Sequence, residues 1–280
     1  MTAKDLFDNV SIEVSKLTTH AYSTSFSIGI RCLGNELRNA IYSIYGFVRF
    51  ADEIVDSFHD YNKSDLLLRF RNDTMTAIDE KISLNPVLNS FQSAVHEYDI
   101  DISLVDTFLK SMEMDLTQRS YDQRGFEEYV LGSAEVVGLM CLHVFCVRDK
   151  QLFAQLKPNA MKLGSAFQKI NFLRDLNADY NGLGRVYFPG VDIEKFDEGC
   201  KKKIEQGIKQ DFEMGFEGIR KLPRSSKLGV YVAYLYYLAL FKKIRNTAPG
   251  FVMKERIRIR NRHKLSILFY SYVKHQLNLI

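Results

Sequence analysis

Residues Phe47 to Asp56 read FVRFADEIVD, a mostly apolar stretch that carries one arginine and three acidic residues. Apolar residues at helical spacing predict a core helix here. Asp52 and Asp56 are four positions apart, so they share one face of this helix and their charges repel. Tyr45 and Arg49 lie on the same face. Because an unpartnered buried carboxylate is very costly, this stripe is predicted to face a water-filled cavity or a cation.

A second polar stripe lies in QKINFLRDLNAD, which runs from Gln168 to Asp179. Gln168, Asn171, Asp175 and Asp179 share one helical face, and apolar residues fill the others. If the two stripes face each other, their four carboxylates need divalent cations. Oxygen ligands without His or Cys indicate a hard ion, Mg²⁺ or alternatively Mn²⁺. The predicted metal ligands and catalytic residues are Asp52, Asp56, Asp175 and Asp179.

Two common kinds of metal site do not fit the spacing of these acidic residues. Asp175-x-Asn177-x-Asp179 begins like a calcium-binding EF-hand loop, but Tyr180 occupies the position of its glycine. A ferritin-like di-iron site requires Glu-x-x-His, and neither stripe contains histidine. A purely structural role stays open, in which the four carboxylates form salt bridges with the arginines near the C-terminus.

Composition indicates an ordinary folded protein of 280 residues, with 46% hydrophobic and 26% charged residues. The net charge of +4 implies no nucleic-acid partner. The four cysteines form neither a CxxC pair nor a zinc motif, and the N-terminus does not resemble a signal peptide. The longest apolar runs, 136–147 and 231–241, are shorter than the roughly 20 residues that span a bilayer. A cytoplasmic protein, soluble or at most peripheral to a membrane, is expected.

Helical periodicity dominates the chain, so a single all-α domain over residues 1–280 is predicted. Asn85-Pro86 is typical of a helix N-cap followed by proline at the first helical position. Helices that are apolar nearly all round, at 42–55, 134–147 and 230–241, are expected at the centre of the bundle. The predicted helices are 4–18, 35–58, 64–82, 86–97, 102–119, 126–147, 152–179, 200–221, 224–246 and 254–277.

The residues beside the carboxylates suggest the substrate. Arg49, Arg174 and Arg185, together with Mg²⁺, suit a diphosphate, which can leave once its charge is neutralised. Aromatic faces can stabilise the carbocation left behind. An allylic isoprenoid diphosphate fits both features, and ordinary core packing is the alternative for the aromatic residues. The residues expected to line the apolar cavity are Phe26, Tyr45, Tyr129, Val136, Val137, Leu139 and Met140.

At these residues the sequence resembles the squalene/phytoene synthase family, and among its members it most resembles bacterial phytoene synthases. The resemblance covers essentially the whole chain. It includes Ser23-Thr24-Ser25-Phe26, the first stripe, Met112 to Asp115 with Tyr121, and Tyr129 to Met140. The second stripe with Gly184-Arg185-x-Tyr187-x-Pro189 completes it.

The resemblance implies an all-α isoprenoid synthase fold and a two-step head-to-head condensation. Two geranylgeranyl diphosphates would give phytoene through a cyclopropylcarbinyl diphosphate, with Mg²⁺ and without NADPH. The substrate-binding residues that it implies are Ser25, Phe26, Tyr45, Arg49, Tyr129, Val137, Gln168, Asn171, Arg174, Arg185 and Tyr187. Glu135 replaces a small residue of the family's central helix, which puts the pocket wall there in doubt.

Three alternatives stay open. The first is a synthase of the same family that uses farnesyl diphosphate and forms squalene or dehydrosqualene. The depth of the pocket decides which chain length fits, and the sequence does not give that depth. A head-to-tail prenyltransferase is expected to carry Asp-Asp-x-x-Asp motifs, which Asp52-Glu53-x-x-Asp56 only approximates. A non-catalytic relative would be expected to have lost motif aspartates, and all four are present.

The C-terminal end is basic. From Lys242 onward it has ten Lys or Arg residues and one acid, Glu255. Within it, Arg256, Arg258, Arg260 and Arg262 alternate with other residues, a spacing closer to a strand than to a helix. These arginines are predicted either to face a membrane surface or to pair with acidic residues of neighbouring helices.

Overall fold

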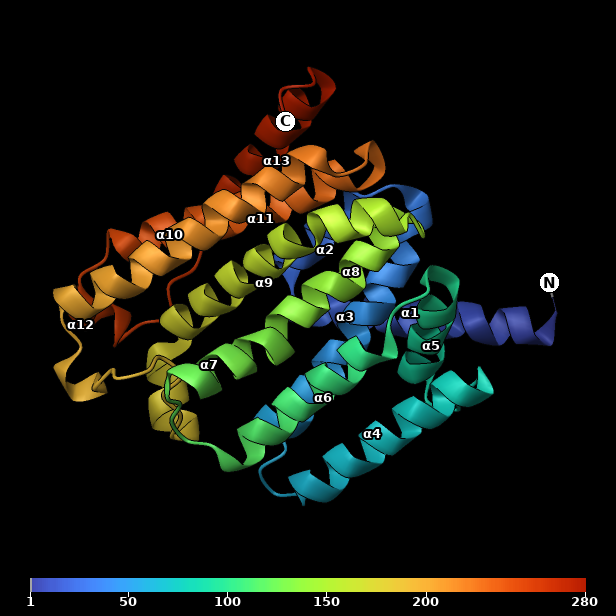
Figure 1. The fold of residues 1–280 in the computed structure, drawn as a ribbon, viewed down its shortest axis with the longest axis horizontal. Helices are drawn as coiled ribbons and strands as arrows, with labels where there is room; N and C mark the ends of the chain where they lie inside the picture. The colour runs from blue at the N-terminus through green and yellow to red at the C-terminus, as the bar shows by residue number, and fades with distance from the viewer. Residues whose placement is uncertain (1) are drawn as a thin grey trace.

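The computed structural model describes residues 2–280 and forms a bundle of helices, drawn in Figure 1. The first half contains α1 (Ala3–Tyr22), α2 (Thr24–Arg31), α3 (Asn35–Asp56), α4 (Lys63–Glu80), α5 (Pro86–Tyr98), α6 (Ile102–Thr117), α7 (Gln123–Val130), the π-helical turn η1 (Leu131–Glu135) and α8 (Val136–Cys146). The second half contains α9 (Lys150–Ala178), the π-helical turn η2 (Asp179–Leu183), the 3-10 turn η3 (Ile193–Lys195), α10 (Glu198–Lys221), α11 (Arg224–Arg245), α12 (Pro249–Val252) and α13 (Asn261–Gln276).

The all-α prediction is confirmed. The described residues contain no strand, only an isolated bridge between Ser120 and Val186. Each predicted helix has a counterpart, and α5 begins as expected, with the Asn85 side chain accepting a hydrogen bond from the Val87 amide at 3.0 Å. The helix predicted at 254–277 begins only at Asn261, because residues 256–260 have no regular secondary structure and Arg260, the N-cap, is in the extended region. The short helices α2 and α12 were not predicted.

The middle of the bundle is made by α3, α8 and α9, as the apolar patterns predicted for the first two (Figure 1). One large apolar cluster joins α3 to α4, α5, α6 and α8, and includes the fully buried Phe47, Phe91 and Phe108. A second cluster joins α9 to α10, α11 and the segment around Phe188. Phe26 of α2 packs against this second cluster. This arrangement places the two polar stripes, on α3 and α9, on helices that belong to different clusters.

The helix from Gln123 to Cys146 corrects one expectation. It runs without a break through α7, η1 and α8, so by length and composition it is able to cross a bilayer, contrary to the prediction for the apolar run within it. More than half of its most apolar window, 56%, is buried in the bundle. Burial of that kind is typical of a core helix, whose apolar surface is covered by its neighbours.

Candidate active site

The first stripe is held by α3. The Arg49 guanidinium donates to Asp52 Oδ2 at 2.5 Å, pairs with Glu53, and stacks over the ring of Tyr22 with 4.3 Å between Cζ and the ring centroid. Burial, and then the charge of Asp56, raise the pKa of Asp52 to about 6. The predicted repulsion between these two carboxylates is therefore present, and Arg49 offsets it only in part.

The second stripe runs from α9 into η2. Asn171 donates to Gln168 Oε1 at 3.3 Å, and Gln168 donates to Ser133 Oγ in the turn η1 at 3.2 Å. One turn further along α9, Arg174 binds Asp175 through Nε at 3.0 Å and Nη2 at 2.5 Å. The amide and carboxylate ends of the stripe thus have separate partners.

The two stripes come together at Asp179. Burial raises the pKa of Asp179 to about 7, and the charges of Asp175 and then Asp56 contribute in the same direction. Because Asp56 belongs to the other stripe, the acidic ends of α3 and α9 lie near each other, which is the arrangement under which a cation site was expected. Within the described residues, however, no group of three or more acidic, His or Cys side chains is placed to hold an ion by itself.

The turn η2 reverses the chain so that Arg185 points back toward α3. Gly184 has φ +65°, a conformation that residues with a Cβ rarely adopt, and the Arg185 amide then bonds Asp179 O at 2.9 Å. The Arg185 side chain is only 3% exposed. Its Nη1 lies 2.7 Å from Asp56 Oδ1, and its Nη2 donates to the backbone oxygen of Asp115 at 2.8 Å. Arg185 therefore connects the segment that follows η2 to the first stripe.

Asp115 of α6 is a buried residue at the centre of this network. Its side chain accepts hydrogen bonds from Tyr129 at 2.6 Å and from Tyr187 at 3.3 Å, and lies 3.5 Å from Arg185 Nη1. Burial raises its pKa to about 7, against the opposing effect of Arg185. In the sequence, Asp115 belongs to the segment that carries the family resemblance, but no pattern there predicts this role for it. Tyr129, predicted to bind substrate, is buried with its hydroxyl on this carboxylate.

Two further side chains reach the second stripe from the C-terminal part of the chain. Tyr237 of α11 donates to Asn171 Oδ1 at 3.3 Å. Arg256 lies with Nε 2.8 Å from Asp175 Oδ1, and Nη2 donates to Oδ2 at 3.2 Å. The hypothesis that basic C-terminal residues pair with acidic residues of neighbouring helices is therefore confirmed for Arg256. Its position in a run of four arginines gave no signal that distinguished it from the others.

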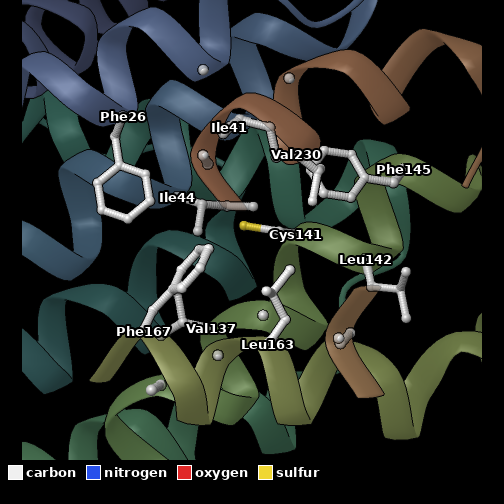
Figure 2. Close-up of a pocket in the computed structure, with 18 of the residues that line it drawn as sticks. Phe26, Ile41, Ile44, Val137, Cys141, Leu142, Phe145, Leu163, Phe167 and Val230 are labelled. Atoms are coloured by element: carbon white, nitrogen blue, oxygen red, sulfur yellow. The ribbon is translucent and has the colours of Figure 1, made fainter. Parts of the chain in front are cut away.

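A cavity of about 300 Å³ opens beside the stripes and extends between α2, α3, α8, α9, α10 and α11. Tyr45, Gln168 and Asn171 lie among its lining residues, so its polar end borders both stripes. The rest is apolar, and Figure 2 shows side chains such as Ile44, Cys141 and Leu163 that surround the space from several helices.

Aromatic rings gather where the cavity approaches the stripes. The Phe26 ring centroid lies 5.8 Å from that of Tyr45 and 5.9 Å from that of Tyr237. Phe167 stacks on Tyr237 at 4.0 Å. These four rings all belong to the cavity lining, beside its polar residues Gln168 and Asn171.

The predicted lining is correct in part. Phe26, Tyr45 and Val137 line the cavity. Four other predicted residues do not, because they lie on buried faces turned toward the core: Tyr129, Val136, Leu139 and Met140. Ser25 is half-buried on α2 outside the lining, while the neighbouring Ser23 caps that helix by accepting from the Phe26 amide at 3.2 Å.

Glu135 does not alter the cavity wall. It is half-buried at the end of η1, outside the lining. Burial raises its pKa, and the nearby cations Lys162 and Lys169 oppose that change. Lys169 also pairs with the buried Asp211 at 2.7 Å. The carboxylate thus belongs to a charged cluster between α9 and α10.

Comparison with known proteins agrees with this architecture. The profile of the family described as squalene/phytoene synthase matches residues 19–263. A 4,4'-diapophytoene synthase of Staphylococcus haemolyticus is 24% identical over 66% of this chain and 64% of its own length. A phytoene synthase of Cereibacter sphaeroides is 24% identical over 79% and 68%. A presqualene diphosphate synthase of Sinorhizobium fredii is 31% identical over 62% and 61%. The match thus spans just under two thirds of the first and third of these relatives.

Solved structures show the same fold. A dehydrosqualene synthase in complex with ligand superposes with a TM-score of 0.82 at 19% identity, covering 96% of this chain and 98% of that one. A squalene synthase from Alicyclobacillus acidocaldarius gives a TM-score of 0.74 at 20% identity, over 85% and 94%. With the family profile matched over 245 residues, from 19 to 263, this chain belongs to the squalene/phytoene synthase family.

Proposed function

We propose that this protein is a prenyltransferase that condenses two geranylgeranyl diphosphates head to head to form phytoene. The observation that carries the proposal is that Tyr45, Gln168 and Asn171 belong both to the two polar stripes and to the lining of the apolar cavity. An isoprenoid diphosphate has the same two parts, an anionic head and an apolar tail. The similarity to phytoene synthases of bacterial origin supports the same reaction.

The polar end supplies the groups that a diphosphate requires. Arg49, Arg174 and Arg185 offer planar guanidinium donors suited to phosphate oxygens, and Tyr187 lies beside Arg185 at 3.2 Å. Gln168 and Asn171 offer amides along the same stripe, and both line the cavity. We assign the binding of the diphosphate heads to this set.

The carboxylates Asp52, Asp56, Asp175 and Asp179 fit Mg²⁺ by donor type. Burial, and then the neighbouring carboxylates, raise the pKa values of Asp52 and Asp179, so a bound cation would favour their charged forms. Bound Mg²⁺ would neutralise the leaving diphosphate. Since the described side chains alone do not converge on an ion, phosphate oxygens are expected to complete the coordination shell.

The apolar part of the cavity protects the reacting carbons. In the first step, the C–O bond to one diphosphate breaks, the allylic cation bonds to the double bond of the second molecule, and a proton leaves. In the second step the other diphosphate departs, the cyclopropylcarbinyl cation rearranges, and a second proton is lost, so no reductant such as NADPH is consumed. The faces of Phe26, Tyr45, Phe167 and Tyr237 suit these cations, and the apolar walls exclude water.

The cavity is long enough along α9 to admit a C20 chain. Its lining includes both Asn171 and Leu156 of α9, which are about 22 Å apart at 1.5 Å per residue. A fully extended geranylgeranyl chain measures about 19 Å and a farnesyl chain about 14 Å, from the C–C bond length. Farnesyl diphosphate remains the second candidate, because similarity to diapophytoene and presqualene diphosphate synthases supports it.

The test uses the purified protein with Mg²⁺ and either diphosphate, without and with NADPH, and identifies products by mass spectrometry. Cys141→Phe narrows the cavity at mid-length, so kcat/KM for the C20 substrate is expected to fall at least tenfold more than that for the C15 substrate. Cys200→Phe, the same change at a half-buried cysteine outside the lining, is the control. Faster condensation of the C15 substrate by the wild type would refute the chain-length assignment, and no condensation of either would indicate a non-catalytic relative.

A further inference from the structure

The C-terminal helix α13 leaves an apolar face uncovered. On its inner side it packs against α11, where Ser271 is fully buried and the Tyr236 hydroxyl donates to Lys264 O at 2.9 Å. On its outer side Leu265, Phe269 and Tyr272, at helical spacing, are 61%, 72% and 52% exposed. Figure 1 shows α13 at the outer edge of the bundle with its C-terminal end projecting from it.

The exposed face continues beyond these three residues. Tyr270, Val273, Leu277 and Leu279 are also exposed. No element among residues 2–280 covers them. An uncovered apolar surface of this extent on a globular protein marks an interaction site more often than chance exposure.

Charge identifies the kind of partner. The segment before α13 and the first turn of α13 carry the exposed residues Arg258, Arg260 and Arg262, and none of the three forms an ion pair with another described residue, unlike Arg256. From residue 249 to 280 the only acidic side chain is Glu255. Two copies meeting through this face would bring like charges together, which disfavours self-association. An anionic surface would neutralise them.

We infer that the outer face of α13, with Arg258, Arg260 and Arg262, docks on the surface of an anionic lipid bilayer. An apolar helix face flanked by basic residues is the pattern of helices that lie in the membrane interface. Tyrosine side chains are favoured at the depth of the lipid headgroups. The inference stands on surface geometry and charge, and holds whether or not the proposed reaction does.

The docking face lies close to the cavity. α11, which α13 covers on the outside, contributes Val230, Ala233 and Tyr237 to the cavity lining. Lys264 Nζ also donates to Thr24 Oγ1 at 2.8 Å, which ties α13 to α2, another cavity wall. A bilayer at this face would therefore be separated from the cavity by a single layer of helices.

The experiment is flotation of the full chain with vesicles of phosphatidylcholine and phosphatidylglycerol, or of phosphatidylcholine alone, at low and high salt. Wild type is expected to bind the anionic vesicles, and high salt to weaken that binding. Leu265→Ser/Phe269→Ser is expected to reduce partitioning at least tenfold. Arg258→Gln/Arg260→Gln/Arg262→Gln is expected to reduce it about fivefold for each arginine removed.

The control is Leu17→Ser/Leu84→Ser, which removes two comparably exposed leucines, on α1 and before α5, and is expected to bind as wild type does. Melting curves check that each variant folds, and the arginine variant tests the inference if the apolar one does not fold. Equal binding by wild type and both α13 variants, or no binding by wild type, would overturn the inference. So would a dimer in sedimentation velocity that the α13 variants convert to monomer, since a second copy would then occupy the face.

Discussion

Replacing Asp179 with Asn removes a partly buried negative charge where the two acidic stripes meet, and is expected to stabilise the fold while abolishing activity. Asn keeps the shape of the side chain and removes its repulsion from Asp175 and Asp56. The variant is expected to gain stability because burial and the two neighbouring carboxylates disfavour the charged form of Asp179 in the folded protein.

The size of this stabilisation follows from the pKa of Asp179, which rises from 3.8 to about 7 on folding. That difference corresponds to about 4 kcal/mol, which we halve to about 2 kcal/mol because water reaches part of the site. For a chain of 280 residues this amounts to about 3 °C in Tm, at ~2.1 cal/mol/K of unfolding entropy per residue.

The stability difference between the Asp179→Asn variant and wild type is expected to depend on pH. A carboxyl group whose pKa is raised in the folded state costs nothing below pH 3.8, and its cost grows until the pH passes about 7. The variant should therefore match wild type near pH 4 and exceed it at pH 8.

Thermal melts at both pH values, without metal, make the measurement, with Asp73→Asn on the exposed face of α4 as the control. A variant less stable than wild type at pH 8 would show that the protein already compensates this charge. A gain of equal size at both pH values would show that the charge is not its cause.

Further substitutions test the remaining parts of the site. Asp52→Asn and Asp175→Asn are each expected to lower turnover of the diphosphate substrate by orders of magnitude while the protein stays folded, and wild-type turnover in both would refute their assignment to the metal. Arg185→Lys is expected to lower turnover at least tenfold and the unfolding free energy by about 1–3 kcal/mol, because lysine lacks the fork that reaches both Asp56 and Asp115. Unchanged turnover and an unchanged melting curve would reduce Arg185 to a dispensable ion pair.

The helical fold and the two stripes were predictable from sequence because both depend on local periodicity. Residues three, four and seven positions apart share a face of any helix, so Tyr45 to Asp56 and Gln168 to Asp179 could be grouped without knowing what they face. The alternating run from Arg256 to Arg260 has a spacing closer to a strand, but the predicted helix 254–277 included it, and the structure gives these residues no regular secondary structure. The roles assigned to these residues in binding and catalysis stay predictions.

Packing between distant segments decided what the stripes meet. Arg256 lies 81 positions from Asp175, and Arg185 lies 70 from Asp115, so no local pattern links these partners. The same is true of Glu135, whose sequence position suggested the cavity wall but whose carboxylate lies among Lys162, Lys169 and Asp211. Sequence by itself determined which residues share a face, since that follows from 3.6 residues per turn; only the tertiary structure decided which faces meet, because that depends on how whole helices pack.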